Sequence, residues 1–252
     1  KVCEECLSKG YRSCIKKRCV KGSLFASVVR VFSMKFHKMI NVYKNVYAFI
    51  TPSEFLKKKL ALNGFDEKRI HCIPTFTASK TTIGEPQIGS YGLYFGRVTE
   101  EKGVETVIKA YEKLPEYTVK IMGDDTTDEA KRLKKYVKDH KMKNVEFLGF
   151  KSGEELEDII KGARFTLIPS IWYDNLPNTA LESFQYSKPV IASNIGSLPE
   201  LVSDGENGYL FEPSNVEDLI KKIKMLDDDI LVKKMGQASR KRLENRFAPQ
   251  SH

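Results

Sequence analysis

From residue 91 onwards, short apolar segments alternate with longer amphipathic ones, and this alternation constrains the fold more than any other feature of the sequence. The apolar segments have the length of strands, and the segments between them have the length and periodicity of helices. Strands that alternate with helices in this way form βαβ units around a parallel sheet. The sequence therefore predicts an α/β fold with a doubly wound parallel sheet. The strands are expected at 91–95, 118–122, 145–148, 165–168, 189–192 and 208–211, and the helices at 104–113, 128–140, 153–161, 179–186, 198–202, 215–226 and 230–245.

The first part of the chain has a different organisation. Two short apolar segments, 46–50 and 69–73, flank a helix that starts at Thr51-Pro-Ser and ends near Asn63-Gly64. Residues 75–90 are rich in Thr, Ser, Gly and Pro and show no periodicity, which is typical of a linker. We therefore predict two domains, 1–78 and 79–252.

The net charge of the chain, +9, is concentrated in its first fifty residues, where eleven Lys and Arg face two acids. A basic segment of this kind attracts phosphates, anionic lipid headgroups or nucleic acid. Residues 22–41 have the pattern of a basic amphipathic helix, which can lie on a membrane surface or pack against a core. No nucleic-acid-binding motif accompanies the charge, so we expect no nucleic-acid partner. No apolar run is long enough to predict a membrane span.

Four of the five cysteines lie close together near the start of the chain. Cys3, Cys6, Cys14 and Cys19 follow the pattern C-x2-C-x7-C-x4-C. Thiolates at such spacing can bind zinc, but the two pairs are closer than in a zinc ribbon and no His is near. A zinc site, disulfides and free thiols all stay open at this point.

In a doubly wound sheet, ligands bind in the loops beyond the carboxyl ends of the strands. The loop 95–103 follows the first strand of the regular region and opens a helix. Gly96 allows close approach of the backbone, and Arg97 and Lys102 bring two cations to a helix N-terminus. This combination suits a diphosphate, although two ordinary surface cations would give the same pattern.

The loop 170–183 is polar and aromatic and also leads into a helix. Asp174 and Glu182 are eight residues apart, and Glu182 is placed to accept hydrogen bonds from ribose hydroxyls. We expect Asn178 and Thr179 to cap the helix, so that backbone N–H groups face a phosphate. An ordinary N-cap followed by a surface Glu explains the same residues.

A third loop, 194–200, follows the strand at 189–192. Gly196 suits a tight turn, and Glu200 opens a short helix, where an acid also has a purely structural role.

Together and in this order, the segments of residues 46–246 resemble the family-4 retaining glycosyltransferases, which have the GT-B fold of two Rossmann-like domains. No single segment decides this resemblance, but the ordered set is highly specific. The segments are Ile50-Thr-Pro-Ser-Glu-Phe, Ile73-Pro74, Gly96-Arg97 with Glu101-Lys-Gly, Val145-Glu-Phe-Leu-Gly, Asp174 with Glu182, Lys188-Pro-Val-Ile-Ala-Ser, Gly196-Ser-Leu-Pro-Glu-Leu-Val and Asn207-Gly-Tyr-Leu-Phe.

The resemblance implies a role for each matching residue. Arg97 and Lys102 would bind the donor diphosphate, and Glu182 matches the second acid of an E-x7-E motif, which binds the ribose. Asp174 matches the first acid of that motif, beside the reaction centre, where the family has the longer Glu. The implied catalytic residues are Asp174, Arg97 and Lys102, and the implied donor-binding residues are Gly96, Arg97, Lys102, Phe150, Lys151, Asp174, Asn175, Leu176, Pro177, Asn178, Thr179 and Glu182.

The resemblance also implies an activity. The protein would move a hexosyl unit, with retention, from a UDP- or GDP-sugar to a hydroxyl of a glycan or lipid-linked acceptor, in the synthesis of cell-surface polysaccharide. No cofactor and no metal would be required. Residues 1–78 would be the end of an acceptor-side domain whose front part precedes residue 1, and similar Cys-rich basic stretches occur in some capsule and polysaccharide members. We expect a cytoplasmic protein, peripheral on the inner face of the membrane.

Three other functions are compatible with parts of the sequence. The first is a non-catalytic nucleotide-sugar-binding subunit that needs a partner chain for the rest of the fold. The second is a nucleotide-sugar epimerase, which shares the two-domain fold but lacks this order of loops. The third is a nucleic-acid-binding module built on the basic N-terminal segment.

Overall fold

The computed structural model describes residues 2–77 and 87–248, and the chain divides into two units, Lys1–Cys72 and Ile73–His252. Most of the predicted linker, residues 78–86, lies outside the described residues. The predicted boundary after residue 78 falls in this part, and the division into an acceptor-side and a donor-side domain stays a prediction.

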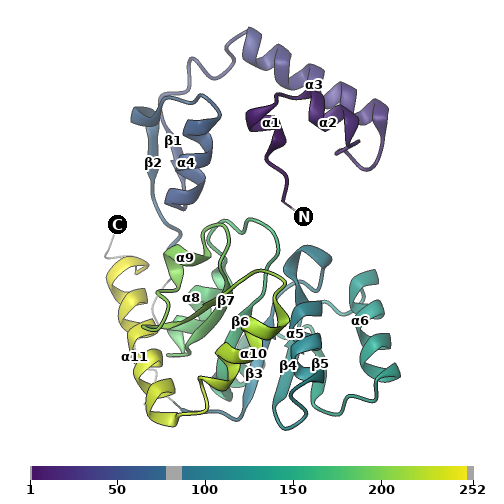
Figure 1. Cartoon of the computed structure of the whole chain (residues 1–252). Helices are drawn as coiled ribbons and strands as arrows, with labels where there is room; N and C mark the ends of the chain where they lie inside the picture. Colours follow the sequence, from purple (N-terminus) through teal and green to yellow (C-terminus); the bar gives the residue numbers. More distant parts are fainter. Residues whose placement is uncertain (1, 78–86, 249–252) are drawn as a thin grey trace. The chain divides into compact units, whose positions relative to one another are not determined.

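The first unit is a set of helices and one pair of parallel strands (Figure 1). The sequence predicts a helix between two strands here, and the structure adds that the strands pair in parallel, which makes a βαβ unit. The expected helix start is confirmed, because the Ser53 hydroxyl accepts a hydrogen bond from the Leu56 N–H at 3.2 Å. The elements are α1 (Glu5–Ser8), α2 (Arg12–Lys16), α3 (Leu24–Met39), β1 (Phe49–Thr51), α4 (Glu54–Leu62), the 3-10 helix η1 (Glu67–Arg69) and β2 (Ile70–Cys72).

Helix α3 is the basic amphipathic helix expected over 22–41. Its apolar face is mostly exposed, and among its described residues only Ser27 and Val31 are buried. Phe25, Phe32 and Met39 stand seven residues apart, on one side of the helix, and are 79%, 71% and 72% exposed. No helix within residues 2–77 and 87–248 is long and apolar enough to cross a membrane.

The second unit contains a six-stranded parallel sheet in the order β5-β4-β3-β6-β7-β8. This confirms the predicted α/β fold. The strands are β3 (Tyr91–Phe95), β4 (Thr118–Met122), β5 (Val145–Gly149), β6 (Ala163–Ile168), β7 (Val190–Ser193) and β8 (Gly208–Phe211). The helices are η2 (Glu100–Lys102), α5 (Val104–Glu112), α6 (Asp128–Asp139), α7 (Gly153–Lys161), α8 (Asn178–Gln185), α9 (Leu198–Leu201), α10 (Val216–Lys224) and α11 (Asp229–Arg246).

The core lies on both faces of this sheet, because successive residues of a strand point to opposite sides. In β3, Tyr94 packs in a cluster with residues of α5, α6 and α10, whereas Leu93 and Phe95 pack in another cluster with Ile160 of α7. Helices α8, α9 and α11 enclose a third cluster with β6 and β7. The sheet is thus covered on both faces, and its loops are left as the places where a ligand can reach the strands (Figure 1).

The sheet also has a point where its growth reverses. The chain adds β4 and β5 on one side of β3 and then returns to place β6 on the other side. In open α/β sheets, ligands bind at such a switch point, beyond the carboxyl ends of the strands. The loops after β3 and β6 are the first and second of the loops singled out in the sequence.

Lys188, just before β7, is a buried cation without a carboxylate partner in the described residues. Its side chain is 1% exposed, and its ammonium donates to the carbonyl oxygens of Gln87 (2.7 Å) and Lys161 (2.6 Å). Lys161 is the last residue of α7, so the ammonium satisfies a carbonyl that the helix leaves unpaired. Burial lowers the pKa of Lys188 from 10.5 to about 8.

This lowered pKa predicts a pH-dependent stability. Between pH 8 and pH 10 the unfolded chain keeps the Lys188 proton and the folded chain loses it, so the free energy of unfolding rises with pH through this window. The full gain is at most about 3 kcal/mol. Urea unfolding across this range should show the rise in the wild type but not in Lys188→Met. Parallel pH profiles of the two proteins would contradict this interpretation.

Candidate functional site

The loops at the carboxyl edge of the sheet are joined by backbone hydrogen bonds. Gly96 N–H donates to Met122 O (2.9 Å), and Gly123 N–H donates to Gly149 O (2.9 Å). The backbones of Gly123 and Gly96 approach closely, because a Cβ atom at Gly123 would lie 1.8 Å from Gly96 O. At Gly96 itself, the nearest atom to an added Cβ is Tyr94 Oη, at 3.5 Å. A Cβ atom at Gly96 would thus make only ordinary van der Waals contacts, and the φ of +144° is what favours glycine there.

The loop after β3 is held against the loop after β6. Gly103 has φ +67°, and a Cβ atom there would lie 2.0 Å from Pro169 O, so only glycine fits. Ile171 N–H donates to Glu101 O at 3.0 Å. These contacts bring together two segments that are seventy residues apart in the sequence.

At this junction, Lys102 and Asp174 form an ion pair. The Lys102 ammonium lies 2.5 Å from Asp174 Oδ1, and the side chains are 20% and 15% exposed. The other carboxylate oxygen of Asp174 accepts a hydrogen bond from the Ser170 hydroxyl. Charge-assisted bonds of this kind are stronger than neutral ones, and partial burial limits their screening by water. Two residues that the sequence singles out separately are thus in direct contact.

The loop after β6 has a strained backbone. Leu176 has φ +60°, a left-handed conformation that costs a non-glycine residue about 1–2 kcal/mol. Its buried side chain packs in the cluster under α8, and Ser197 of the loop after β7 supports its backbone. The Ser197 hydroxyl accepts from Leu176 N–H (2.7 Å) and donates to Asp174 O (2.7 Å). The turn at Gly196, predicted from the sequence, has φ +64° and brings Ser197 to this position.

The N-terminus of α8 lies beside Gly96, since the methyl group of Thr179 is 4.0 Å from the position of a Cβ there. The predicted capping by Asn178 and Thr179 is wrong: the N-cap is Pro177, which has no side-chain cap, and both residues lie inside the helix. Proline in the preceding turn sets the helix start one residue earlier than expected. Within the described ranges, the backbone N–H groups of Asn178 and Thr179 have no acceptor. They form the positive end of the helix.

Glu182 lies one turn into α8 and is partly buried. In the part of the chain that the structure describes, its carboxylate has neither an ion-pair nor a hydrogen-bond partner. Burial raises the pKa of Glu182 above 4.5, and no neighbouring charge offsets this effect. A partly buried carboxylate without a donor is available to accept hydrogen bonds from a ligand.

The remaining predicted residues occupy the outer part of the same edge. Phe150 and Lys151 follow β5, the edge strand of the sheet, and Phe150 is exposed while Lys151 pairs with Glu155 at 2.6 Å. Arg97 is exposed at the end of β3. No hydrogen bond or ion pair within the described residues joins Phe150 or Lys151 to Lys102 and Asp174.

Three residues of this edge were not predicted. Gly123 allows the backbone to approach Gly96 O, and Ser197 supports the strained backbone at Leu176. The Tyr94 hydroxyl donates a hydrogen bond to Arg97 O at 2.5 Å. Burial, followed by the charge of Asp174, raises the pKa of Tyr94. Ser197 lies within the third loop that the sequence singled out, but only the sheet order shows that this loop supports the second.

The cysteines of the first unit are all free thiols. Cys14 is buried, whereas Cys3 and Cys19 are exposed. Among residues 2–77 and 87–248, no group of three or more His, Cys, Asp or Glu side chains is arranged to hold a metal ion. The structure therefore does not bring Cys3, Cys6, Cys14 and Cys19 together as zinc ligands.

Comparison with known protein families gives an assignment for the chain. Residues 79–242, which include β3 to β8 and the loops described above, match the family described as Glycosyl transferases group 1. The chain belongs to this family. Group 1 glycosyl transferases are transferase enzymes, and the match covers every residue of the candidate site.

Curated relatives share part of the chain. An uncharacterized glycosyltransferase of Methanocaldococcus jannaschii is 32% identical over 59% of this chain and 41% of its own length. Glycogen synthase of Mycobacterium tuberculosis is 30% identical over 73% of this chain and 44% of its own length. The chain thus spans about half the length of the curated relatives that it matches.

Solved structures share the fold. A glycosyltransferase from Rickettsia africae superposes with a TM-score of 0.75 at 21% identity, over 84% of this chain and 63% of that one. HepE of Anabaena, in complex with UDP and glucose, superposes with a TM-score of 0.71 at 20% identity, over 80% of this chain and 59% of that one. Glycosyltransferases of this architecture thus share the parallel sheet of the second unit.

The role of Ser197 in the group 1 site can be tested with Ser197→Ala. This change leaves Leu176 N–H without its acceptor and removes the shorter of the two hydrogen bonds to Asp174 O, so we expect a loss of about 1–3 kcal/mol in stability and, under the donor-site proposal below, a weaker affinity for UDP. Ser239→Ala is the matched control. Ser239 lies on α11 and is equally buried, but its hydroxyl donates to Asn207 O, away from the site. Calorimetry should show both variants destabilised and only Ser197→Ala weaker in binding. Equal UDP affinities for the two would exclude the supporting role.

Proposed function

We propose that this chain carries the donor-binding part of a retaining glycosyltransferase. It would move a hexosyl unit from a nucleotide-diphosphate sugar to a hydroxyl of a glycan or lipid-linked acceptor, in the synthesis of cell-surface polysaccharide. The observation that carries the proposal is the contact between Lys102 and Asp174, at the switch point of the sheet, in a loop whose first residue, Gly96, lies beside the N-terminus of α8.

In this proposal, the diphosphate lies between the loop after β3 and the start of α8. Arg97, Lys102 and the backbone N–H groups of Asn178 and Thr179 provide positive charge and hydrogen-bond donors, which is the combination that binds phosphates at helix N-termini. When the glycosidic bond breaks, negative charge develops on the leaving diphosphate. These same groups, already in position, stabilise that charge without a metal ion.

The other parts of the donor would contact the remaining residues. Asp174 orients the hexosyl group and supports the positive charge that develops on its ring, with retention at the anomeric carbon. Glu182 accepts hydrogen bonds from the ribose hydroxyls, and Phe150 and Lys151 lie at the base. We propose a UDP-sugar as the donor, with a GDP-sugar as the alternative, because HepE of Anabaena has been crystallised with UDP and with UDP-glucose.

The first unit would be the acceptor side, as the end of an N-terminal domain covering residues 1–78. It contains a groove of about 780 Å³ between α3, α4 and the segments around β1. Four cations, Arg30, Lys38, Lys44 and Arg69, line this groove together with one acid, Asp66. A groove with this charge suits an anionic acceptor such as a lipid-linked diphosphate glycan.

We further propose that α3 holds the protein on the cytoplasmic face of an anionic membrane. Its exposed stripe of Phe25, Phe32 and Met39 can enter the interface between headgroups and acyl chains. The nine excess positive charges of the first fifty residues provide the electrostatic attraction. Both features are needed, since neither a short apolar stripe nor surface charge alone gives stable binding.

Thermal unfolding with added nucleotides tests the donor site. A ligand at 100 times its Kd stabilises the folded state by about 2.7 kcal/mol, so UDP should raise the melting temperature of the wild type. Arg97→Ala should lose most of this shift, because it removes one of two cations at the diphosphate.

The control for this experiment is Arg132→Ala. Arg132 is a surface arginine of α6 that pairs with Glu105 and Glu129, so its loss changes stability by about 1 kcal/mol or less and should leave the UDP shift intact. A larger shift with GDP than with UDP would assign the other donor base. A folded wild type that responds to neither nucleotide would contradict the proposed donor site.

Vesicle sedimentation tests the membrane proposal. The wild type should bind phosphatidylglycerol vesicles but not phosphatidylcholine vesicles, and high salt should weaken the binding. Phe25→Ser with Phe32→Ser should abolish it, because both side chains are exposed and their loss leaves the fold intact. Ile230→Ser, an equally exposed apolar residue of α11, is the control. Binding that survives in the double variant would exclude α3 as the anchor.

A further inference from the structure

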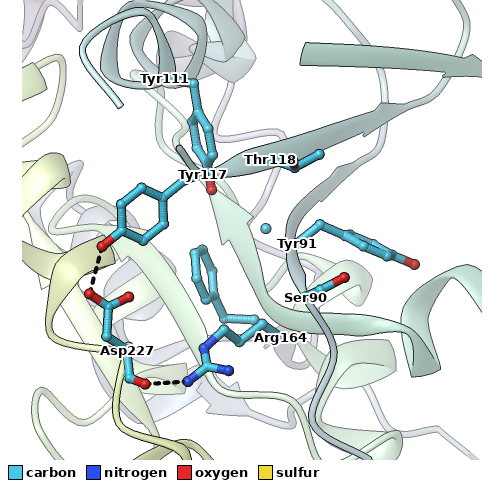
Figure 2. Close-up of a pocket in the computed structure, with 9 residues that line it drawn as sticks. Ser90, Tyr91, Tyr111, Tyr117, Thr118, Arg164 and Asp227 are labelled. Atoms are coloured by element: carbon cyan, nitrogen blue, oxygen red, sulfur yellow. Dashed lines mark hydrogen bonds between the residues drawn. The ribbon is translucent and has the colours of Figure 1, made fainter. Parts of the chain in front are cut away.

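A pocket lies at the amino-terminal edge of the parallel sheet, opposite the candidate donor site. It has a volume of about 260 Å³ and is formed where β3, β4 and β6 begin (Figure 2). The opposite ends are separated by the full length of the strands: Tyr91, in the pocket lining, begins β3, whereas Gly96 follows its last residue. No residue of this pocket belongs to the donor site.

The inner wall of the pocket carries a hydroxyl group without a partner. Tyr111 is fully buried, and in the described part of the chain its Oη atom makes no hydrogen bond. The hydroxyl points into the pocket (Figure 2). Burial raises the pKa of Tyr111, so the hydroxyl stays protonated and remains an unsatisfied donor. Gly92 makes room for it, because a Cβ atom there would lie 2.2 Å from Tyr111 Oη.

Of the two charged side chains that line the pocket, Arg164 is already paired, whereas the Asp227 carboxylate has no ion pair among the described residues. Arg164 donates to Leu226 O and Asp227 O, both at 2.6 Å, and pairs with Asp229 at 2.6 Å. The Asp227 carboxylate accepts from the Tyr117 hydroxyl at 2.6 Å (Figure 2). An anionic ligand would therefore find no unpaired cation here, whereas a neutral ligand with hydroxyl groups can donate a hydrogen bond to the Asp227 carboxylate.

The remaining lining combines hydroxyl groups with aromatic rings. Ser90 and Thr118 are exposed at the mouth, Tyr111 presents its hydroxyl inside, and the rings of Phe165 and Tyr117 form apolar walls. A pyranose ring has the matching chemistry, because its C–H face packs on an aromatic ring and its hydroxyls donate and accept hydrogen bonds. The volume is below that of typical sites for larger organic ligands, so it suits one sugar ring.

We propose that this pocket is a second saccharide site, which binds one neutral pyranose unit of a glycan through the Tyr111 hydroxyl. The choice of a saccharide rests on the proposed glycosyltransferase function. A glycan held here would be bound to the second unit away from the donor site, so the enzyme would keep hold of a polymer while its other end reacts. The pocket itself would take no part in the transfer.

Saturation-transfer NMR with the methyl glycosides of glucose, galactose, mannose and N-acetylglucosamine tests this proposal. UDP is added first, so that the donor site is occupied and its binding is measured in the same samples. At least one glycoside should bind the wild type. Tyr111→Phe should weaken this binding about tenfold through loss of one hydrogen bond, and Ser90→Trp should abolish it by closing the mouth.

The matched control is Tyr136→Phe, which removes the hydroxyl of an α6 tyrosine that donates to Glu112 outside the pocket. It should bind the glycoside as the wild type does, and all variants should bind UDP equally. Tyr111→Phe removes only a hydroxyl that has no partner in the described residues, so this variant should melt no lower than the wild type. If Tyr111→Phe does not fold, the test rests on Ser90→Trp, because Ser90 is exposed. The proposal is overturned if UDP binds the wild type and no glycoside does. It is also overturned if folded Tyr111→Phe, or Ser90→Trp in its place, binds the glycoside as tightly as the wild type. Failure of UDP to bind would instead contradict the donor site.

Discussion

The ion pair between Lys102 and Asp174 is the contact around which the candidate site is organised. It joins the loop after β3 to the loop after β6, and neighbouring residues hold Lys102 or Asp174 in place. Gly103 lets the lysine loop approach the backbone of Pro169, while Ser170 and Ser197 hold the carboxylate and the carbonyl of Asp174. A closed pair of opposite charges can be opened by a ligand that offers a partner to each. A diphosphate for the lysine and sugar hydroxyls for the aspartate fit this requirement.

The order of strands explains why these residues meet. Because β3 and β6 are neighbours although seventy residues separate them, the loops that follow them face each other at the carboxyl edge. The same order creates a second junction at the amino edge, where the unpaired hydroxyl of Tyr111 lies. One topological reversal thus generates two regions of different character. Within the described residues, the carboxyl edge has N–H groups without an acceptor and an exposed arginine, whereas the arginine of the amino edge is paired with Asp229.

The fold could be predicted from the sequence to within one or two residues for most elements, because strands of a sheet covered on both faces are continuously apolar and the helices between them show a period of 3.6 residues. Lys102 and Asp174 could be selected as candidates, but their contact depends on the strand order, which local patterns do not contain. The capping of α8 was mispredicted because Pro177, and not Asn178, precedes its first turn. From the sequence pattern, Tyr111 is predicted to be an ordinary core residue of an amphipathic helix. Only the three-dimensional structure shows that its hydroxyl has no partner in the described residues.

The central claim is that the donor binds where Lys102 and Asp174 meet, and a crystal structure with UDP-glucose tests it most directly. The account predicts that the ion pair opens, with the diphosphate between Lys102, Arg97 and the start of α8, the glucose against Asp174, and the ribose at Glu182. A structure in which UDP-glucose lies elsewhere, with Lys102 still paired to Asp174, would contradict it.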